Sequence, residues 1–317
     1  MRFRVTKAGV IYLTVLFFVM PVLFYFVNFD RSLNLDYLNY KVNYESNWKQ
    51  FEFGFSFIES GFQSFNIEFD YFWIFIIFLE LFLISLLYNN YAVLLLAFPN
   101  LIYLSQGMLG TQIRFGLAVL ISLVIFKYSY RKWWYYLASL ASILFHNAIL
   151  VLFALSSYLK FSFSHQFRIL HKKNFNAFIL VAIGFFFISF AVSAILSQMG
   201  YYYYVGTKYQ EGRSLAAILY LIGSLFFLLV LLFNKNLSGR YAEFVYLGLL
   251  ITIFSLIFNQ SSIISGRYSL VYLLVEPFIL YSFCYSLCRK GNLFYLLLFL
   301  FFLLFSLSKF VSLNLYF

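Results

Sequence analysis

Three arginines lie beside small and polar residues at the ends of strongly apolar segments: Arg114 in Gln-Ile-Arg-Phe-Gly, Arg213 in Glu-Gly-Arg-Ser and Arg267 in Ser-Gly-Arg-Tyr-Ser. A charge next to hydrocarbon is costly unless it reaches the interface or meets an anion, so each is a candidate functional residue. Guanidinium groups suit bidentate contacts to phosphate. Arg114 and Arg213 also begin predicted helices, where free N–H groups favour an anion. The three predict a phosphate site; the alternative is that they reach the interface or pair with acids such as Glu211.

His146 is an ionisable residue inside an apolar segment, Ile-Leu-Phe-His-Asn-Ala-Ile-Leu. Imidazole can serve as a general base near neutral pH, or as a ligand for a phosphate or a sugar hydroxyl. A histidine in a membrane segment can also be a hydrogen-bonded packing residue, and this alternative stays open. His165 and His171 lie in a basic segment and are predicted to be solvated.

Acidic and aromatic residues occur together in the polar segment 29–70, in Asp36-Tyr37-Leu38-Asn39-Tyr40 and in Glu52-Phe53-Gly54-Phe55. Carboxylates bond to sugar hydroxyls and aromatic rings cover sugar faces, so this pattern is typical of a carbohydrate site. A single acid in a loop is also expected simply to be solvated. Glu80 and Glu276 lie inside hydrophobic stretches, where the cost of a charge favours pairing within a helix bundle.

The sequence gives no support for a metal or cofactor site. It has no Gly-rich phosphate loop, no His-Glu-x-x-His motif, no Ser-His-Asp signature and no Asp-x-Asp. Cys284 and Cys288 lie four residues apart near the end of an apolar segment, and a metal site or disulfide framework needs more partners than these. We therefore expect no metal and no cofactor, which argues against a metal-dependent sugar transferase.

The composition places these residues in a membrane protein. Of 317 residues, 64% are hydrophobic and only 10% are charged, whereas soluble domains carry about 25% charged residues. Apolar stretches of about 20 residues recur along the chain. The predicted fold class is therefore all-α, a polytopic integral membrane protein.

The net charge of +11 has a topological explanation. The excess Lys and Arg residues gather in the segments that the positive-inside rule assigns to the cytoplasm. The opposite side carries bases and acids in balance. This distribution predicts a cytoplasmic N-terminus and argues against a nucleic-acid partner.

We expect about 10–11 transmembrane helices in a single transmembrane domain, 1–317, with an external loop at 29–70. Segment 133–159 differs from the others because both of its flanks are basic. It is expected to enter the membrane and return, with a break near His146-Asn147 lining a cavity; two tilted full crossings are the alternative. The other helices are predicted at 8–28, 71–88, 91–105, 112–127, 175–198, 214–233, 242–258, 268–287 and 293–310.

The ordered set of motifs resembles the EpsG-like branch of the Wzy O-antigen and exopolysaccharide polymerases. The motifs that carry the resemblance are Asp36-Tyr-Leu-Asn-Tyr, Glu52-x-Gly-Phe, Gln112-x-Arg114-x-Gly-Leu-Ala, Phe145-His146-x-Ala148 and Arg267-Tyr268. The resemblance implies a helical fold similar to the GT-C-like polysaccharide polymerases. It also implies transfer of a growing glycan from undecaprenyl pyrophosphate to the next lipid-linked repeat unit, without a metal, at the outer face of the bacterial inner membrane.

The resemblance also implies roles and partners. The partners are an undecaprenyl-pyrophosphate-linked oligosaccharide and membrane lipids, with a chain-length regulator and a flippase as further candidates. The carried-over roles are catalytic for His146, Asp36 and Glu52, pyrophosphate-binding for Arg114, Arg213 and Arg267, and sugar-binding for Tyr37, Tyr40, Gln112 and Tyr268.

Two other classes of function remain open from the sequence. A flippase for lipid-linked oligosaccharide would share the cations and the cavity, but is expected to show pseudo-repeated halves. A membrane O-acyltransferase would use a lone buried histidine such as His146 and an acyl-donor channel, and would not need three external arginines.

Overall fold

The computed structural model describes residues 6–28, 34–163, 214–233, 241–259, 261–287 and 293–312. Within these ranges the chain forms helices and turns and no strand. Five described helices are long and apolar enough to cross a membrane, and three shorter apolar helices accompany them. The predicted class, an all-α polytopic membrane protein, is confirmed. The predicted helix 175–198 lies outside the described residues, so the total of about 10–11 crossings stays a prediction.

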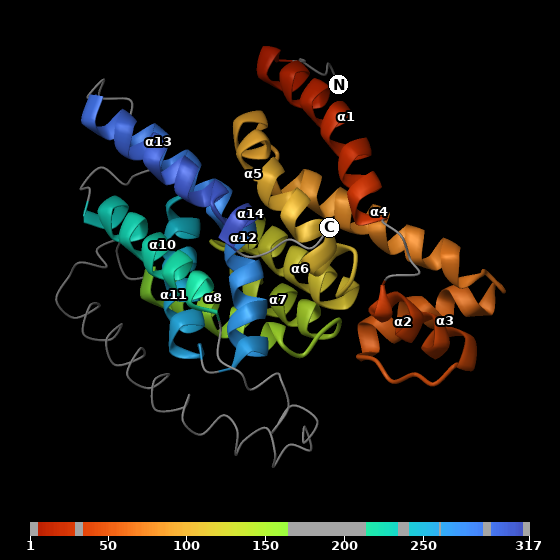
Figure 1. Ribbon diagram of the computed structural model, residues 1–317. Helices are drawn as coiled ribbons and strands as arrows, with labels where there is room; N and C mark the ends of the chain where they lie inside the picture. Colours follow the sequence, from red (N-terminus) through yellow and green to blue (C-terminus); the bar gives the residue numbers. More distant parts are fainter. Residues whose placement is uncertain are drawn as a thin grey trace. The chain divides into compact units, whose positions relative to one another are not determined.

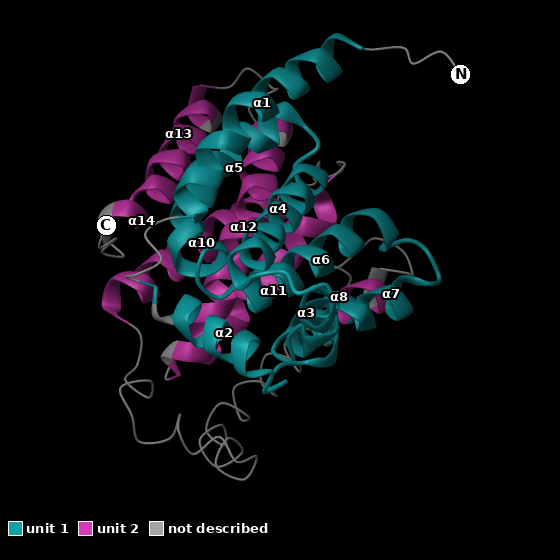
Figure 2. Cartoon of the chain, turned by 90° about the vertical axis from the view of Figure 1, so that its right-hand side faces the viewer, with its two compact units in different colours: residues 1–157 teal, residues 158–317 magenta. Residues whose placement is uncertain are grey.

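The chain divides into two compact units, residues 1–157 and residues 158–317 (Figure 2). The sequence predicted one transmembrane domain over the whole chain. Each unit is described below by itself.

The long helices of unit 1 begin and end within two residues of the predicted positions. Polar caps help to define their starts: Thr6 Oγ1 accepts from Gly9 N–H at 3.2 Å, and Asn90 Oδ1 accepts from Ala92 N–H at 2.9 Å. Pro99 lies inside the helix that begins at Tyr91, and this helix continues as a π-helical turn, Ser105–Leu109. These helices are α1 (Lys7–Val27), α4 (Phe69–Leu87), α5 (Tyr91–Leu104) and α6 (Ile113–Ser129).

Helices α4 and α6 pack closely because α6 carries a glycine at the contact. A Cβ on Gly116 would lie 2.6 Å from Glu80 Oε1, and Glu80 itself is fully buried. At the other end of the pair, Lys127 of α6 donates to the Leu86 carbonyl of α4 at 3.0 Å and to Asn89 Oδ1 at 2.7 Å. A cation there satisfies carbonyls of the last helical turn. The start of α6 is thereby held in a defined position against α4.

The segment expected to be a polar loop, 29–70, contains two helices, α2 (Leu35–Ser46) and α3 (Phe53–Ser64), which lie together beside the start of α4 (Figure 1). Asn34 caps α2 by accepting from Tyr37 N–H at 3.1 Å. Tyr37, Tyr40 and Tyr44 recur at helical spacing and are buried. This aromatic stripe is the reason the segment folds, and the composition-based prediction of a loop missed it.

Segment 133–159 forms the broken hairpin that its charge pattern predicted. Helix α7 (Tyr135–Ile143) ends before His146, and α8 (Ile149–Phe163) begins after it. The hydroxyl of Tyr135, at the start of α7, donates to Ser156 Oγ at 2.6 Å. Ser156 lies two turns into α8, so the two arms run back alongside each other.

Unit 2 contains a closely packed helix pair and an internal ion pair. The helices α11 (Ala242–Ile257) and α12 (Ser262–Leu287) touch at Gly248, where a Cβ would lie 2.7 Å from Ile279 Cδ1. Lys309 bonds to Glu276 at 3.0 Å with both side chains fully buried, so one of the two predicted buried acids is paired. Helix α12 begins at Ser262, earlier than the predicted 268. The described helices are α10 (Leu215–Phe233), α11 (Ala242–Ile257), α12 (Ser262–Leu287), α13 (Leu293–Leu307) and α14 (Lys309–Ser312).

Candidate functional site

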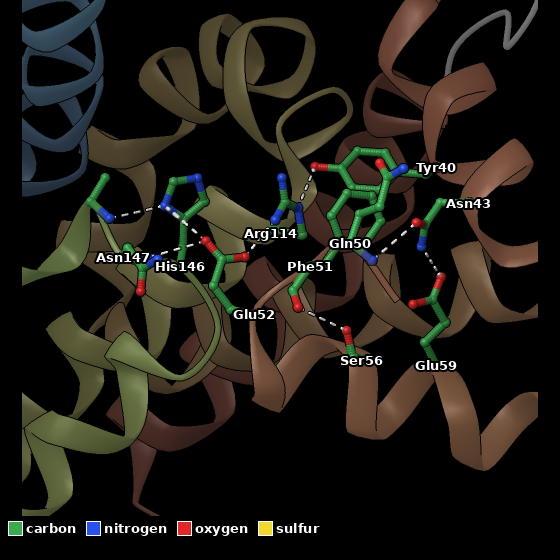
Figure 3. Close-up of polar contacts among 11 residues, drawn as sticks. Tyr40, Asn43, Gln50, Phe51, Glu52, Ser56, Glu59, Arg114, His146 and Asn147 are labelled. Atoms are coloured by element: carbon green, nitrogen blue, oxygen red, sulfur yellow. Dashed lines mark hydrogen bonds and ion pairs between the residues drawn. The ribbon is translucent and has the colours of Figure 1, made fainter. Parts of the chain in front are cut away.

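Arg114 is the second residue of α6, and neighbours hold its guanidinium from three directions (Figure 3). Nε donates to the Tyr40 hydroxyl at 3.2 Å, and Nη1 forms an ion pair with Glu52 Oε2. The guanidinium carbon lies 3.9 Å from the centroid of the Phe51 ring. Of its five N–H groups, two are engaged in this way, and the other three have no partner in the part of the chain that the structure describes. With 20% of the side chain exposed, Arg114 can contact a further anion.

Glu52 joins Arg114 to the break between α7 and α8. It occupies the N-cap position of α3, and its Oε1 accepts from Asn147 N–H at 3.2 Å. Two residues on, Gly54 N–H donates to the Leu144 carbonyl at 2.7 Å. A Cβ on Gly54 would lie 3.0 Å from that oxygen. The spacing Glu52-x-Gly54 therefore places a carboxylate and a closely approached backbone against the same break.

His146 lies in this break, beside Glu52. Its Nδ1 accepts from Ala148 N–H at 3.1 Å and is 4.0 Å from Glu52 Oε1. The imidazole packs edge-on against Phe115 of α6, with 5.4 Å between ring centroids. Only 12% of the side chain is exposed. The ring is thus fixed by its backbone contact and by packing.

Three helix N-termini meet at this cluster. Glu52 directly precedes α3, Arg114 lies in the first turn of α6, and Asn147 and Ala148 directly precede α8. Unpaired N–H groups and the helix dipole give each N-terminus a partial positive charge. Together with the guanidinium, this arrangement favours an anion.

A second layer of polar contacts fixes the chain that carries Phe51 and Glu52. Asn43 of α2 donates to Glu59 Oε1 at 3.0 Å and accepts from Gln50 N–H at 3.4 Å. Glu59 is buried on α3, and burial raises the pKa of its carboxyl, although the bond from Asn43 partly offsets this. The α2–α3 connection is therefore tied to both helices.

Tyr40 links this layer to Arg114. Its ring packs against Phe51, Phe55 and Trp73, with centroid separations of 5.1, 5.9 and 5.9 Å. Burial raises the pKa of the Tyr40 hydroxyl, and the Arg114 guanidinium partly offsets the shift. The hydroxyl therefore stays neutral and serves as an acceptor for Arg114 Nε.

Three further predicted residues lie around the cluster. Asp36 is half-buried on α2, close enough to Tyr40 to act electrostatically on its hydroxyl. Tyr37 is buried and donates to Asp70. Gln112 caps α6 without a side-chain bond, and its Oε1 is buried with no partner among the described residues. Gln112 is therefore the one of the three with an unused buried acceptor.

The other predicted residues belong to unit 2 or fall outside the described ranges. Arg267 and Tyr268 lie on α12; Arg267 is partly exposed, and Tyr268 is buried with its ring 4.7 Å from that of Phe254. Arg213 lies outside the described residues, which resume at Ser214, just before α10. A pyrophosphate site shared by all three arginines stays a prediction.

Sequence reasoning missed several residues of the cluster. Phe51, Asn43 and Glu59 carry no motif, and only their place within or shortly after the tyrosine-rich stretch 37–44 hints at a role. No group of three or more His, Cys, Asp or Glu side chains in the described ranges is placed to hold a metal ion. The chemistry that the cluster can supply is anion binding by Arg114 and proton exchange at Glu52 or His146.

The fold and the site define a polytopic helical membrane protein with a partly buried cluster of an arginine, a carboxylate and an imidazole. The chain belongs to the EpsG family, whose family model matches residues 12–317. This confirms the resemblance found in the sequence motifs, and membership indicates a polysaccharide polymerase-type function. No curated protein and no solved structure matches the chain.

Proposed function

We propose that this protein polymerises lipid-linked oligosaccharide repeat units. A growing glycan is transferred from undecaprenyl pyrophosphate to a hydroxyl of the next lipid-linked unit, at the outer face of the bacterial inner membrane. The N-terminus is then cytoplasmic. The partners are the lipid-linked donor and acceptor and the surrounding lipids, with a flippase and a chain-length regulator acting before and alongside it.

The observation that carries this proposal is the position of Arg114 where three helix N-termini meet. The leaving group of the proposed reaction is a lipid diphosphate, which gains negative charge as the glycosidic bond breaks. Three N–H groups of Arg114 have no partner among the described residues, and they are suited to hold that charge. Oriented donors in a poorly hydrated site stabilise a charge that develops in the transition state.

The acceptor half of the reaction needs a group that takes or orients the hydroxyl proton. Glu52 and His146 lie beside Arg114. Asp36 lies on α2, one turn before Tyr40. A hydroxyl that attacks opposite the departing diphosphate inverts the anomeric centre. The proposed reaction needs no metal, since cationic side chains neutralise the diphosphate.

The test is the synthesis of a glycan ladder by purified protein in detergent, given the lipid-linked repeat unit alone. We expect wild type to make polymer and Arg114→Ala to lose about 10²–10³-fold in rate, as for removal of an oriented donor. Arg131→Ala is the matched control because Arg131 is an exposed arginine of the same unit. The absence of polymer with wild type, or a normal ladder with Arg114→Ala, would refute the proposal.

A deletion strain separates the alternative functions. Loss of a polymerase leaves single repeat units on the lipid carrier. Loss of a flippase leaves no units at the surface, and loss of an acyltransferase leaves full-length chains that lack the acyl group.

A further inference from the structure

We propose that an acidic pocket between α2, α3 and the start of α4 binds a sugar of the lipid-linked glycan. The pocket has a volume of about 520 Å³, which is within the range of small-molecule sites. This inference rests on the proposed polymerase function, and it gives the glycan a binding site apart from the diphosphate. The charged and amide side chains that line the pocket are Lys41, Glu45, Gln63, Asn66, Glu68 and Asp70.

The charges of this lining disfavour a diphosphate. Three carboxylates, those of Glu45, Glu68 and Asp70, line the pocket together with one ammonium, that of Lys41. Lys41 Nζ is itself 3.8 Å from Glu45 Oε1. A diphosphate would therefore meet mostly like charges. A sugar is the opposite case, because its hydroxyls donate to carboxylates in charge-assisted hydrogen bonds.

The acids of the pocket do not converge on one point. In the described ranges, no three acidic, imidazole or thiol side chains are placed to hold a metal ion together. Two amides, Gln63 and Asn66, complete the polar lining. An amide both donates and accepts, as a hydroxyl does. Acceptors at separate positions, together with amides, suit a ligand that carries several hydroxyl groups around a ring.

Two of the lining side chains are available to such a ligand. Glu68 is exposed, and it precedes α4 without capping that helix through a side-chain bond. Asn66 is exposed in the turn before it. Among the described contacts, neither the Glu68 carboxylate nor the side-chain amide of Asn66 has a partner.

Hydrogen bonds within the fold hold the walls of the pocket. Gln63 Nε2 donates to the Tyr44 carbonyl at 2.7 Å, which ties the last turn of α3 to α2. The chain then turns at Asn66, whose φ of 53° is left-handed and whose N–H donates to the Gln63 carbonyl at 2.9 Å. On the α4 side, Asp70 accepts from the hydroxyl of the buried Tyr37. A lining that is held before a ligand arrives lowers the entropic cost of binding.

Helices α2 and α3 connect the pocket to the Arg114 cluster. On α2, Lys41 directly follows Tyr40, whose hydroxyl accepts from Arg114 Nε. Glu52 directly precedes α3 and Gln63 lies in its last turn, so this helix of 12 residues separates them by about 18 Å. A glycan of a few sugars covers such a distance. One substrate can therefore hold its diphosphate at Arg114 and a sugar in the pocket.

Asn66→Gly and Glu68→Gln test the pocket with little disturbance of the backbone. Glycine keeps the left-handed conformation and removes the amide, and glutamine keeps the size of the side chain and removes its charge. The probe is the repeat-unit oligosaccharide of the host, released from its lipid carrier by mild acid, and calorimetry measures its binding to purified protein. We expect binding to weaken about 3–10-fold in Asn66→Gly and about 10-fold in Glu68→Gln, as for lost hydrogen bonds.

Asn47→Gly is the matched control. Asn47 is also an exposed asparagine with a left-handed φ, 52°, and it does not line the pocket. Its substitution should leave the affinity for the oligosaccharide unchanged. Thermal unfolding of each variant in detergent shows whether a loss of binding is a loss of fold.

Inorganic pyrophosphate is a second probe, and it separates the two sites. Arg114→Ala should weaken the binding of pyrophosphate, whereas Asn66→Gly and Glu68→Gln should not. In ladder assays, the two pocket substitutions should raise the KM for the lipid-linked repeat unit and change kcat little, because the pocket is away from the reacting bond.

Three results would overturn the assignment: no binding of the oligosaccharide by wild type, unchanged binding in both pocket variants, or an equal loss in Asn47→Gly. Weaker binding of pyrophosphate in Glu68→Gln would also overturn it, since the pocket would then belong to the diphosphate. If wild type binds the oligosaccharide through the pocket but makes no polymer, the proposed function has failed and the pocket assignment has not. If wild type makes polymer while the pocket variants bind normally, only the pocket assignment has failed.

Discussion

Glu52 and Arg114 are 62 residues apart in the sequence and form an ion pair that joins the start of α3 to the start of α6. The sequence had left open that the arginine pairs with an acid, and it does. The pair does not exhaust the guanidinium, because two of five donors are engaged among the described contacts. Arg114 is therefore both a link between the two helices and a candidate ligand for an anion.

Arg114→Lys is expected to lower the polymerisation rate about 10²-fold. An ammonium has three donors, but all of them are on one nitrogen atom and the group has no planar face. Lysine therefore cannot reach Tyr40 and Glu52 from separate nitrogen atoms while it lies flat on Phe51. Initial rates of ladder formation at several donor concentrations measure the effect. A normal rate with lysine would mean that charge alone suffices and that the planar contacts are unimportant.

Tyr40→Phe is expected to slow the reaction, because Arg114 loses a bond that orients its guanidinium; such a bond to a charged group contributes about 1.5–3 kcal/mol. The substitution removes the oxygen that accepts from Arg114 Nε but keeps the buried ring. Tyr44→Phe is the control, since its hydroxyl on the same helix bonds to the Ile67 carbonyl instead. Equal effects of the two substitutions would show that only packing of α2 matters.

Gly54→Ala is expected to lower activity strongly while the protein still folds. The added Cβ would lie 3.0 Å from the Leu144 carbonyl and 3.1 Å from Leu144 Cβ, so α3 or the break must shift and move Glu52 away from His146. Gly61→Ala on the same helix has no atom within 4 Å of the added Cβ. The second variant should keep full activity and gain slightly in stability, because alanine favours a helix. Ladder assays and thermal unfolding of the pair test this directly.

The sequence predicted those features of the fold that depend on local pattern. Hydrophobic length located the helices of unit 1 within two residues, and the flanking charges predicted the hairpin with its break at His146. Both signals lie within the segment concerned. The aromatic stripe of α2 was also local, at Tyr37, Tyr40 and Tyr44, but the low overall hydrophobicity of that segment obscured it.

The partners within the site could not be predicted, because they depend on contacts between distant segments. Nothing near Arg114 indicates that Glu52 will reach it, or that Phe51 will lie under the guanidinium. The motifs named the right neighbourhood, since Glu52, Arg114 and His146 come together. Their contacts required the geometry, in particular the bond between His146 Nδ1 and Ala148 N–H.

In unit 2, Lys309→Met is expected to destabilise the protein by about 3–5 kcal/mol, because it leaves Glu276 as an uncompensated buried charge. Glu276 also accepts from the Tyr220 hydroxyl at 2.7 Å, which is not enough to replace the cation. The double variant Lys309→Met with Glu276→Gln should recover much of the loss. Thermal unfolding in detergent measures all three proteins. No recovery in the double variant would mean that Lys309 stabilises the fold by packing alone.

Glu59→Gln is expected to stabilise the protein at neutral pH and to have little effect in acid. Burial raises the pKa of the Glu59 carboxyl above its ordinary 4.5, so the folded state favours the protonated form. The stability contributed by that form is fully present below 4.5 and is lost as the pH rises through the folded-state pKa. Glutamine carries no charge at any pH and can still accept the bond from Asn43. The unfolding temperature of the variant should therefore exceed that of wild type at neutral pH and approach it below 4.5.

Glu45→Gln is the control because Glu45 is exposed and its ion pair with Lys41 is at the surface. A gain for Glu59→Gln that does not change with pH would show that relief from burying a charge is not its cause.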